Sequence, residues 1–322
     1  MQLPLNQKTR NGVFLLKKHN SSGLQAVKAC GLALFISLSV VFSACKTVPE
    51  VSSVNPLDVM DGNSSFYLRI PASVDSVLLE QILKGKFRGI SDSDASKIIA
   101  HIDTVYIGLN RSRKGVDYQI ALSCNFPQIY VKSAFTKKNG WEGDSLTLSA
   151  PDGKARKYTV YQGAGTLVSF PSESLACFGR NVPAMVEKYH NLSFSSESIT
   201  AEDSVSGDVY SWLSYDNGIP DNEIHFFADK PQSFLTMLTG AQLNYQLSYV
   251  RGRMYNDTKN DKQYIMQLEF EFRDKRMVQA AKGALSLAFG LTDSELTRDS
   301  DTHITVSNIK ISKAQLYKIL VL

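Results

Sequence analysis

Side chains that most often carry out acid–base or metal chemistry are scattered along this chain of 322 residues. No HExxH, paired-cysteine or EF-hand spacing occurs. The carboxylates of residues 216–223 surround Gly218 in a pattern typical of a solvated turn, not of a calcium loop. The sequence therefore predicts no metal and no cofactor, and it favours a protein without enzymatic activity. The five histidines stand apart from one another and are His19, His101, His190, His225 and His303.

A nucleophilic serine is poorly supported as well. Ser307 and Lys310 have the SxxK spacing of some serine enzymes, but that chemistry needs a helix that places the lysine one turn away. Here both residues lie in a strand-like run, where a spacing of three puts two side chains on opposite faces. No GxSxG motif is present. A catalytic serine is therefore not predicted.

Two pairs of arginines are candidates for binding. They are predicted at the tips of two β-hairpins, where they could bind anionic lipid headgroups or an acidic partner. The alternative is that they are solvated tips that discourage aggregation through sheet edges. The four residues are Arg111, Arg113, Arg251 and Arg253.

A group of aromatic residues, Tyr210, Trp212 and Tyr215, precedes the turn at Asp216-Asn217-Gly218. Stacked rings at such a turn could hold a sugar or a protein partner. A strand that packs Trp212 into the core fits the same spacing. The sequence leaves both interpretations open and favours the second.

The chain begins with a basic leader that has no acidic residue before Glu50. From Gly31 to Ala44 the leader is apolar apart from three serines, and Cys45 follows directly. A short apolar run behind positive charges predicts a secretory signal, residues 1–44, that is removed on export. The run is shorter than the roughly 20 apolar residues that a membrane-spanning helix needs.

Residues 1–45 resemble the signal of bacterial lipoproteins, in which small residues precede the cysteine. Three residues before the cysteine, Phe42 replaces the usual leucine. In this respect the cleavage motif resembles the less strict motifs of spirochaete lipoproteins. The resemblance implies cleavage before Cys45 and acyl chains such as palmitate on that residue, so that the membrane is the expected partner. It also implies the cell envelope, with the outer membrane preferred because Lys46 and Thr47 lack an acidic retention signal. No family is recognised for the rest of the chain.

Removing the signal changes the charge of the protein. The leader holds five of the 35 basic residues and none of the 31 acidic residues, so the mature part has a net charge near −1. This charge gives no basis for a nucleic-acid partner. Within the mature part, Cys124 and Cys177 either form a disulfide, which an oxidising envelope permits, or remain two buried thiols. The absence of a CxxC motif favours free thiols slightly.

The mature part is predicted to contain a tether and two halves. Residues 45–64 are rich in Ser, Val, Pro and Asn without helical periodicity, which predicts a flexible tether. Residues 65–190 and 208–322 are the two halves. Residues 191–207, which are Ser-rich and acidic, are the predicted linker.

The two halves are predicted to share one order of elements, β-α-β-β-α-β, which is the order of a ferredoxin-like sandwich. The fold class is therefore α+β with an internal repeat. In the first half the expected elements are a strand at 66–70, helices at 74–83 and 92–99, a hairpin at 104–126, a helix at 128–138, strands near 145–149, 156–162 and 166–170, and helical content over 172–190. In the second half they are a strand at 224–227, a helix at 232–238, hairpin strands at 244–250 and 263–272, a helix at 275–291, a strand at 302–311 and a helix at 313–320.

These features together predict a lipid-anchored protein of the cell envelope that acts as a non-enzymatic binding or assembly module. The sequence does not identify its ligand, whether protein or small molecule. Two alternatives stay open. One is an envelope hydrolase with a site between the two halves, and the other is a lipid-interacting protein that uses the arginine tips and the apolar helix at 277–291.

Overall fold

The computed structural model of the chain describes residues 54–86, 90–112, 115–194, 204–214, 218–232, 234, 246–289 and 293–321. Cys45, Arg113, Tyr215 and most of the helix expected at 232–238 lie outside these residues. None of the helices in the described part is both long enough and apolar enough to cross a membrane.

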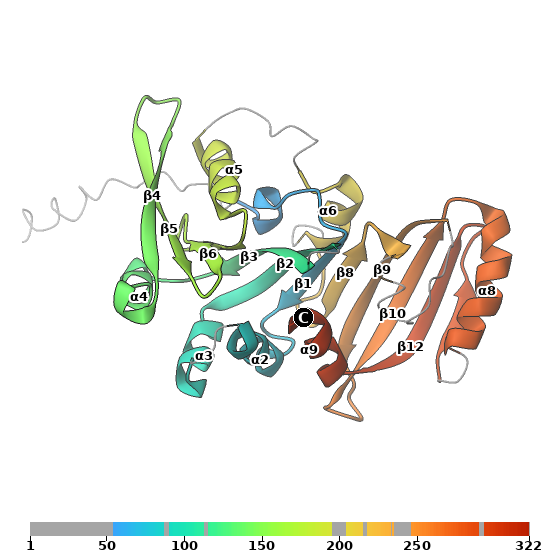
Figure 1. Cartoon of the computed structure of the whole chain (residues 1–322). Helices are drawn as coiled ribbons and strands as arrows, with labels where there is room; N and C mark the ends of the chain where they lie inside the picture. The colour runs from blue at the N-terminus through green and yellow to red at the C-terminus, as the bar shows by residue number, and fades with distance from the viewer. Residues whose placement is uncertain are drawn as a thin grey trace, which may run out of the picture. The chain divides into compact units, whose positions relative to one another are not determined.

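One antiparallel sheet runs through the described residues (Figure 1). The two predicted halves meet where β8 (Ile224–Ala228) pairs with β1 (Phe66–Pro71), with Leu68 opposite Phe226. From one edge to the other the strands are β11 (Glu295–Arg298), β12 (His303–Ser312), β10 (Gln263–Phe272), β9 (Leu247–Asn256), β8 (Ile224–Ala228), β1 (Phe66–Pro71), β2 (Ile102–Ser112), β3 (Gly115–Cys124), β7 (Leu175–Gly179), β6 (Thr166–Ser169), β5 (Ala155–Gly163) and β4 (Glu142–Ser149).

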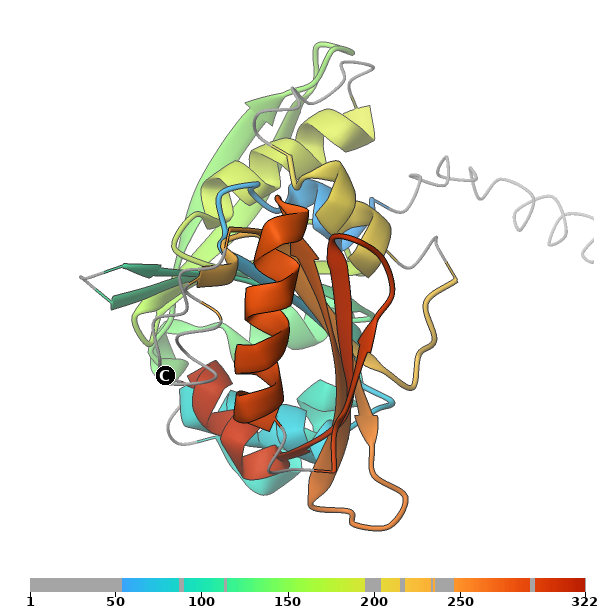
Figure 2. The same ribbon diagram turned by 90° about the vertical axis from the view of Figure 1, so that its right-hand side faces the viewer.

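Helices pack on both faces of this sheet, and each face has its own apolar core. Successive residues of a strand point to opposite faces, so Leu68 and Phe226 enter one core while Tyr67 and Phe227 enter the other. The first core lies on what we call the α2/α8 face, which carries α2 (Ser76–Lys86), α3 (Asp92–Ile99), α4 (Gln128–Ala134), α8 (Lys275–Phe289) and α9 (Lys313–Val321). The opposite α5/α6 face carries η1 (Pro56–Val59), α5 (Val182–Phe194) and α6 (Gly207–Leu213). Figure 2 shows α8 lying lengthwise against the strands.

The predicted α+β class is confirmed, but the strand order predicted for each half is wrong. A ferredoxin-like sandwich places its first strand between two later ones. Here β1-β2-β3-β7 and β8-β9-β10-β12 are each a row of antiparallel neighbours. The reason is that β1 pairs with β2 on one side and with β8 on the other, so neither edge of β1 is left for a parallel neighbour.

Three local predictions also need correction. The expected tether ends before residue 64, because Leu57 and Met60 in and after η1 are fully buried in the core of the α5/α6 face. The region expected to be helical from residue 172 contains strand β7, and α5 begins only at Val182. Pro183 lies in the first turn of α5, where the missing N–H of proline breaks no helical hydrogen bond. The short strand β11 was not expected at all.

Cys124 and Cys177 are free thiols. They lie on adjacent strands but belong to the two different cores, on opposite faces of the sheet. A disulfide between them is therefore excluded by the direction of their side chains. Burial raises the pKa of the Cys124 thiol to about 12 and raises that of Cys177 as well, so neither is a reactive thiolate at neutral pH.

The buried carboxylate of Asp75 ties the two halves together. It accepts a hydrogen bond from Tyr264 Oη at 2.7 Å and an ion pair from Lys313 Nζ at 2.6 Å, while its second oxygen caps α2 by accepting from the Leu78 N–H at 2.9 Å. Only 5% of the Asp75 side chain is exposed. Burial raises the pKa of Asp75, but the hydrogen bonds from Lys313, Leu78 and Tyr264 outweigh it, and the resulting pKa lies below the usual value.

We expect Asp75→Asn to lower the free energy of unfolding by about 3–5 kcal/mol at neutral pH, because it leaves the Lys313 ammonium without its partner. The folded-state pKa of Asp75 is depressed, so its contribution is present above the unfolded pKa of about 3.9 and is lost as pH falls through the folded value. The difference between wild type and variant should therefore shrink below about pH 4 in urea denaturation followed by circular dichroism. The control is Asp92→Asn, which removes an exposed ion pair with Lys84. An equal loss in both variants would contradict the assigned role of Asp75.

Candidate functional site

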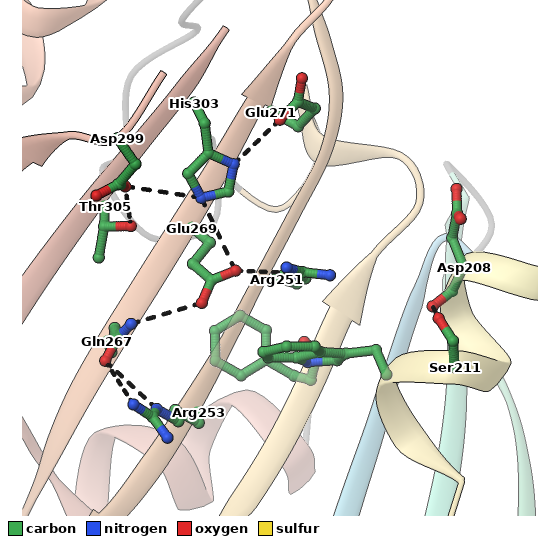
Figure 3. A network of polar contacts seen from close by, with 12 residues as sticks. Asp208, Ser211, Arg251, Arg253, Gln267, Glu269, Glu271, Asp299, His303 and Thr305 are labelled. Carbon is green, nitrogen blue, oxygen red and sulfur yellow. Dashed lines mark hydrogen bonds and ion pairs between the residues drawn. The ribbon is translucent and has the colours of Figure 1, made fainter. Parts of the chain in front are cut away.

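On the α5/α6 face a polar surface lies over β9, β10 and β12, whose described residues add no buried member to the apolar core of that face. The burial of β10 alternates strictly, with its buried residues on the α2/α8 face and, apart from Ile265, polar residues on the other side. We call this surface the polar face (Figure 3). Its side chains come from three neighbouring strands and are Arg251, Arg253, Gln267, Glu269, Glu271, His303 and Thr305.

Arg251 links the polar face to helix α6. Its Nε donates to Glu269 Oε2 at 2.7 Å, directly across from it on β10. Its guanidinium lies over the ring of Trp212, 4.1 Å from the ring centre, and 5.4 Å from the centre of the Tyr249 ring. Trp212 in turn donates from Nε1 to the Phe226 carbonyl at 3.0 Å. The stack is worth about 0.5–2 kcal/mol and fixes the direction of the arginine.

Arg253 continues the row by contacting Gln267 and Glu223. Its Nη2 donates to Gln267 Oε1 at 3.1 Å, and its Nη1 lies 3.7 Å from Glu223 Oε2. The same Glu223 oxygen bonds His225 Nε2 at 2.9 Å. Each of the two guanidinium groups is thus held beside a carboxylate, which fixes the direction of the arginine side chain. Neither arginine lies beside a nucleophile in the described part of this network.

His303 sits among three carboxylates. Its Nδ1 lies 3.0 Å from Glu271 Oε2, and its Nε2 lies 3.9 Å from Glu269 and 3.8 Å from Asp299. Thr305, the nearest hydroxyl of the network, donates to Asp299 at 2.6 Å. The hydroxyl proton is therefore already engaged by a carboxylate, and the imidazole is positioned by acids instead of activating a nucleophile.

His225 lies beneath the polar face, directly across from Arg69 on β1. Burial lowers the pKa of His225, and the charges of Arg69 and Arg253 lower it further, while the Glu223 carboxylate opposes both effects. A neutral imidazole at neutral pH that donates from Nε2 to Glu223 satisfies this geometry. Arg69 is fully buried and is neutralised by Asp221, whose carboxylate lies 2.8 Å from Arg69 Nη2.

The other two histidines of the described chain are engaged elsewhere. His190 bonds the Tyr158 hydroxyl at 3.1 Å and the Ser149 carbonyl at 3.2 Å. His101 packs its ring against Phe126 and Tyr130. Each therefore has a structural role beside aromatic neighbours.

In the structure, two of the four predicted arginines, Arg251 and Arg253, do not lie at a hairpin tip. Arg251 and Arg253 lie inside β9, and the tip is formed by residues 257–262, so the predicted position is wrong. The signal was present in the sequence, because Val250, Gly252 and Met254 continue the alternation of the strand. Arg111 lies in β2 opposite Val116, but its side chain is outside what the structure describes.

The aromatic group is only partly assembled. Trp212 lies in helix α6, so the strand expected there is wrong; its ring centre lies 5.3 Å from that of His225. Tyr210 packs against the core of the α5/α6 face. The structure thus brings together Trp212, Arg251 and Arg253. The carboxylates and His303 that join them were missed, because cross-strand neighbours far apart in sequence leave no linear motif.

The apolar helix considered as an alternative for lipid contact packs one side against the protein core. In α8, Val278, Ala281 and Leu285 pack into the core of the α2/α8 face, while the opposite side of the helix carries Gln279 and Lys282. This is the arrangement of an ordinary amphipathic helix on a sheet.

The fold of this chain is similar to that of solved structures. Three crystal forms of TP0453, forms I, III and IV, align with TM-scores of 0.60, 0.59 and 0.57. Each is 17% identical in sequence, and the alignments cover 84% of this chain and 98% of those chains. These likenesses establish the fold. No curated protein sequence matches the chain significantly.

The protein is a membrane-anchored lipoprotein of the cell envelope. Residues 51–317 match the family described as outer membrane-associated lipoprotein TP0453, and the chain belongs to that family. The match supports the lipoprotein resemblance and the predicted preference for the outer membrane. It also gives a family to the mature part, for which the sequence alone had suggested none.

Proposed function

We propose that the protein is a non-enzymatic binding module, held at the outer membrane by acyl chains on Cys45, and that the polar face is its binding surface. The observation that carries the proposal is the charge of this surface. Two guanidinium groups, Arg251 and Arg253, lie among four carboxylates, those of Glu223, Glu269, Glu271 and Asp299. The two positive guanidinium groups and the four negative carboxylates together give a charge of −2.

Binding fits the geometry better than catalysis does. The carboxylates of the polar face hold arginines or His303 in place, and the thiols of the described chain are buried with raised pKa values. A hydrolase needs a free nucleophile within reach of a base. The network offers charge in a fixed arrangement, which is what recognition of a charged partner requires.

The partner that suits the polar face is a cationic protein segment. The two carboxylates that are most open to solvent, Glu271 and Asp299, have 26% and 42% of their side chains exposed. They lie on either side of His303, which contacts Glu271 through Nδ1 and Asp299 through Nε2 (Figure 3). A lysine or arginine of the partner can approach them without displacing the Arg251–Glu269 pair.

We expect Glu271→Gln combined with Asp299→Asn to weaken binding of a fluorescent octalysine peptide to the full chain, with the wild-type affinity falling as salt rises toward physiological strength. Fluorescence anisotropy measures the dissociation constant. The matched control is Asp92→Asn with Asp94→Asn, which removes the same charge from the start of α3. Equal weakening by the two double variants would show binding to net charge alone and would contradict a specific polar face.

The anchor is tested by labelling with radioactive palmitate in the cells that export the protein. Wild type should incorporate label and Cys45→Ser should not, because the thiol is the acylation site that the resemblance implies. Cys124→Ser, which alters a buried thiol, should label as wild type does. Equal labelling of wild type and Cys45→Ser would exclude Cys45 as the anchor.

A further inference from the structure

The two edges of the sheet differ in how they are protected. Edge strand β11 has only four residues, carries Glu295 and Arg298 at its ends, and pairs with a strand that bulges at Ser307 and Asn308. Short length, charged side chains and bulges are devices by which natural sheets prevent other strands from adding to an edge. This edge is therefore closed to pairing.

Edge strand β4 is protected less, because its only charged side chains, Glu142 and Asp144, lie at its start. It is eight residues long, contains no Lys, Arg or Pro, and pairs with β5 without any shift in register. Most of its residues are exposed, among them Ser145 and Thr147. In the described part of the chain its only strand neighbour is β5, so the outward N–H and C=O groups of β4 are available to a further strand.

The hairpin of β4 and β5 extends beyond the strand behind it. β6 pairs with β5 only from Val160 to Gly163, so the outer part of the hairpin is a two-stranded ribbon (Figure 1). A two-stranded ribbon is marginal alone in water. One face of this ribbon packs against α5 through Tyr158, which contacts Tyr189 and His190, while the β4 edge stays open.

The charges of the hairpin are separated along its length. The start of β4 is acidic, with Glu142 and Asp144, whereas the end of the turn and the start of β5 are basic, with Lys154, Arg156 and Lys157. A strand that adds to β4 must therefore complement an acidic end and a basic end at once. A uniformly cationic segment would complement only the acidic end.

We propose that β4 is a site of strand addition and that its occupant is β4 of a second copy of this chain, paired antiparallel about a two-fold axis. An antiparallel arrangement brings the acidic end of each hairpin beside the basic end of the other. With Leu146 of the two copies opposite each other, Ser145 faces Thr147 and Asp144 faces Leu148 of the other copy. Leu148 is the cross-strand neighbour of Arg156. No like charges oppose one another in this register, and the pairing is isologous, as closed dimers require.

The test is cross-linking of the full-length protein in its own membranes. Leu146→Cys, treated with a short bis-maleimide, should give a band of twice the chain mass on a denaturing gel. In two differently tagged copies, Ser145→Cys in one and Thr147→Cys in the other should cross-link as well; both positions are exposed, so the result does not depend on a change at Leu146. The parent protein, given the same cross-linker, should form no dimer band, because its thiols at Cys124 and Cys177 are buried.

Two controls decide the result. Thr297→Cys on the β11 edge should stay monomeric under the same treatment. Ser145→Lys with Thr147→Lys, added to Leu146→Cys, should abolish the dimer band, because each new lysine faces another across the two-fold axis. The proposal fails if Leu146→Cys and the tagged pair both remain monomeric, if Thr297→Cys dimerises equally, if the lysines leave the dimer band unchanged, or if β4 cross-links to a different protein instead.

Discussion

The pairing of β1 with β8 is the constraint on which the rest of the fold depends. It joins strands that are more than 150 residues apart in the chain, and every other strand is added outward from this pair. The pairing is short, but it is flanked by apolar side chains on both faces, since Leu68 and Phe226 fill one core and Tyr67 and Phe227 the other. Burial of each such side chain contributes about 1.5–3 kcal/mol. The Asp75 carboxylate adds a polar tie between the same two halves.

The same pairing explains the location of the polar face. On the α5/α6 side, apolar residues from η1, α5 and α6 cover the first half and the centre of the sheet, and Trp212 lies at the boundary of that covering. Beyond Trp212 the strands turn charged side chains toward solvent, as antiparallel sheets with one solvated face do. Arg251 bridges the two regions by stacking on Trp212 while it binds Glu269. The edge of the apolar core of the α5/α6 face and the charged residues of the polar face therefore meet at Arg251 and Trp212.

Period-two alternation and helix signals in the sequence were sufficient for most elements. The pattern of β10 predicted a half-buried strand, and the acidic residues Asp92 and Asp94 predicted the start of α3. The Ser91 cap of that helix was seen only in the structure. Pairing was not predictable, because the ferredoxin-like order and the observed row of antiparallel neighbours have the same elements in the same sequence. The tether was misjudged for a related reason: Leu57 lies in a short 3-10 helix and Met60 directly follows it, and so short a helix leaves no recognisable period.

At the candidate site, too, the sequence did not predict which residues of neighbouring strands would lie together. A bulge at Ser307 and Asn308, where Asn308 has a φ of 59°, shifts the alternation of β12. Ser307 and Lys310, expected on opposite faces, therefore both point away from the core that takes Val306 and Ile309. A single inserted residue reverses a strand's faces. Its trace in the sequence is the spacing of three between Val306 and Ile309, in a run of apolar residues that are otherwise two apart. In the polar face, Arg251 and Trp212 were recognisable as binding residue types. Their acidic partners became visible only when β10 and β12 were placed beside β9.

Hydrogen–deuterium exchange of the full chain under native conditions tests the central claim that β1 and β8 make one cooperative sheet from the two halves. The amides of β1, β2, β8 and β9 should then exchange with a common free energy equal to that of global unfolding. If β8, β9 and β10 exchanged through a separate opening of lower free energy while β1, β2 and β3 stayed protected, the two halves would be independent units, and the β1–β8 pair would not be what holds the fold together.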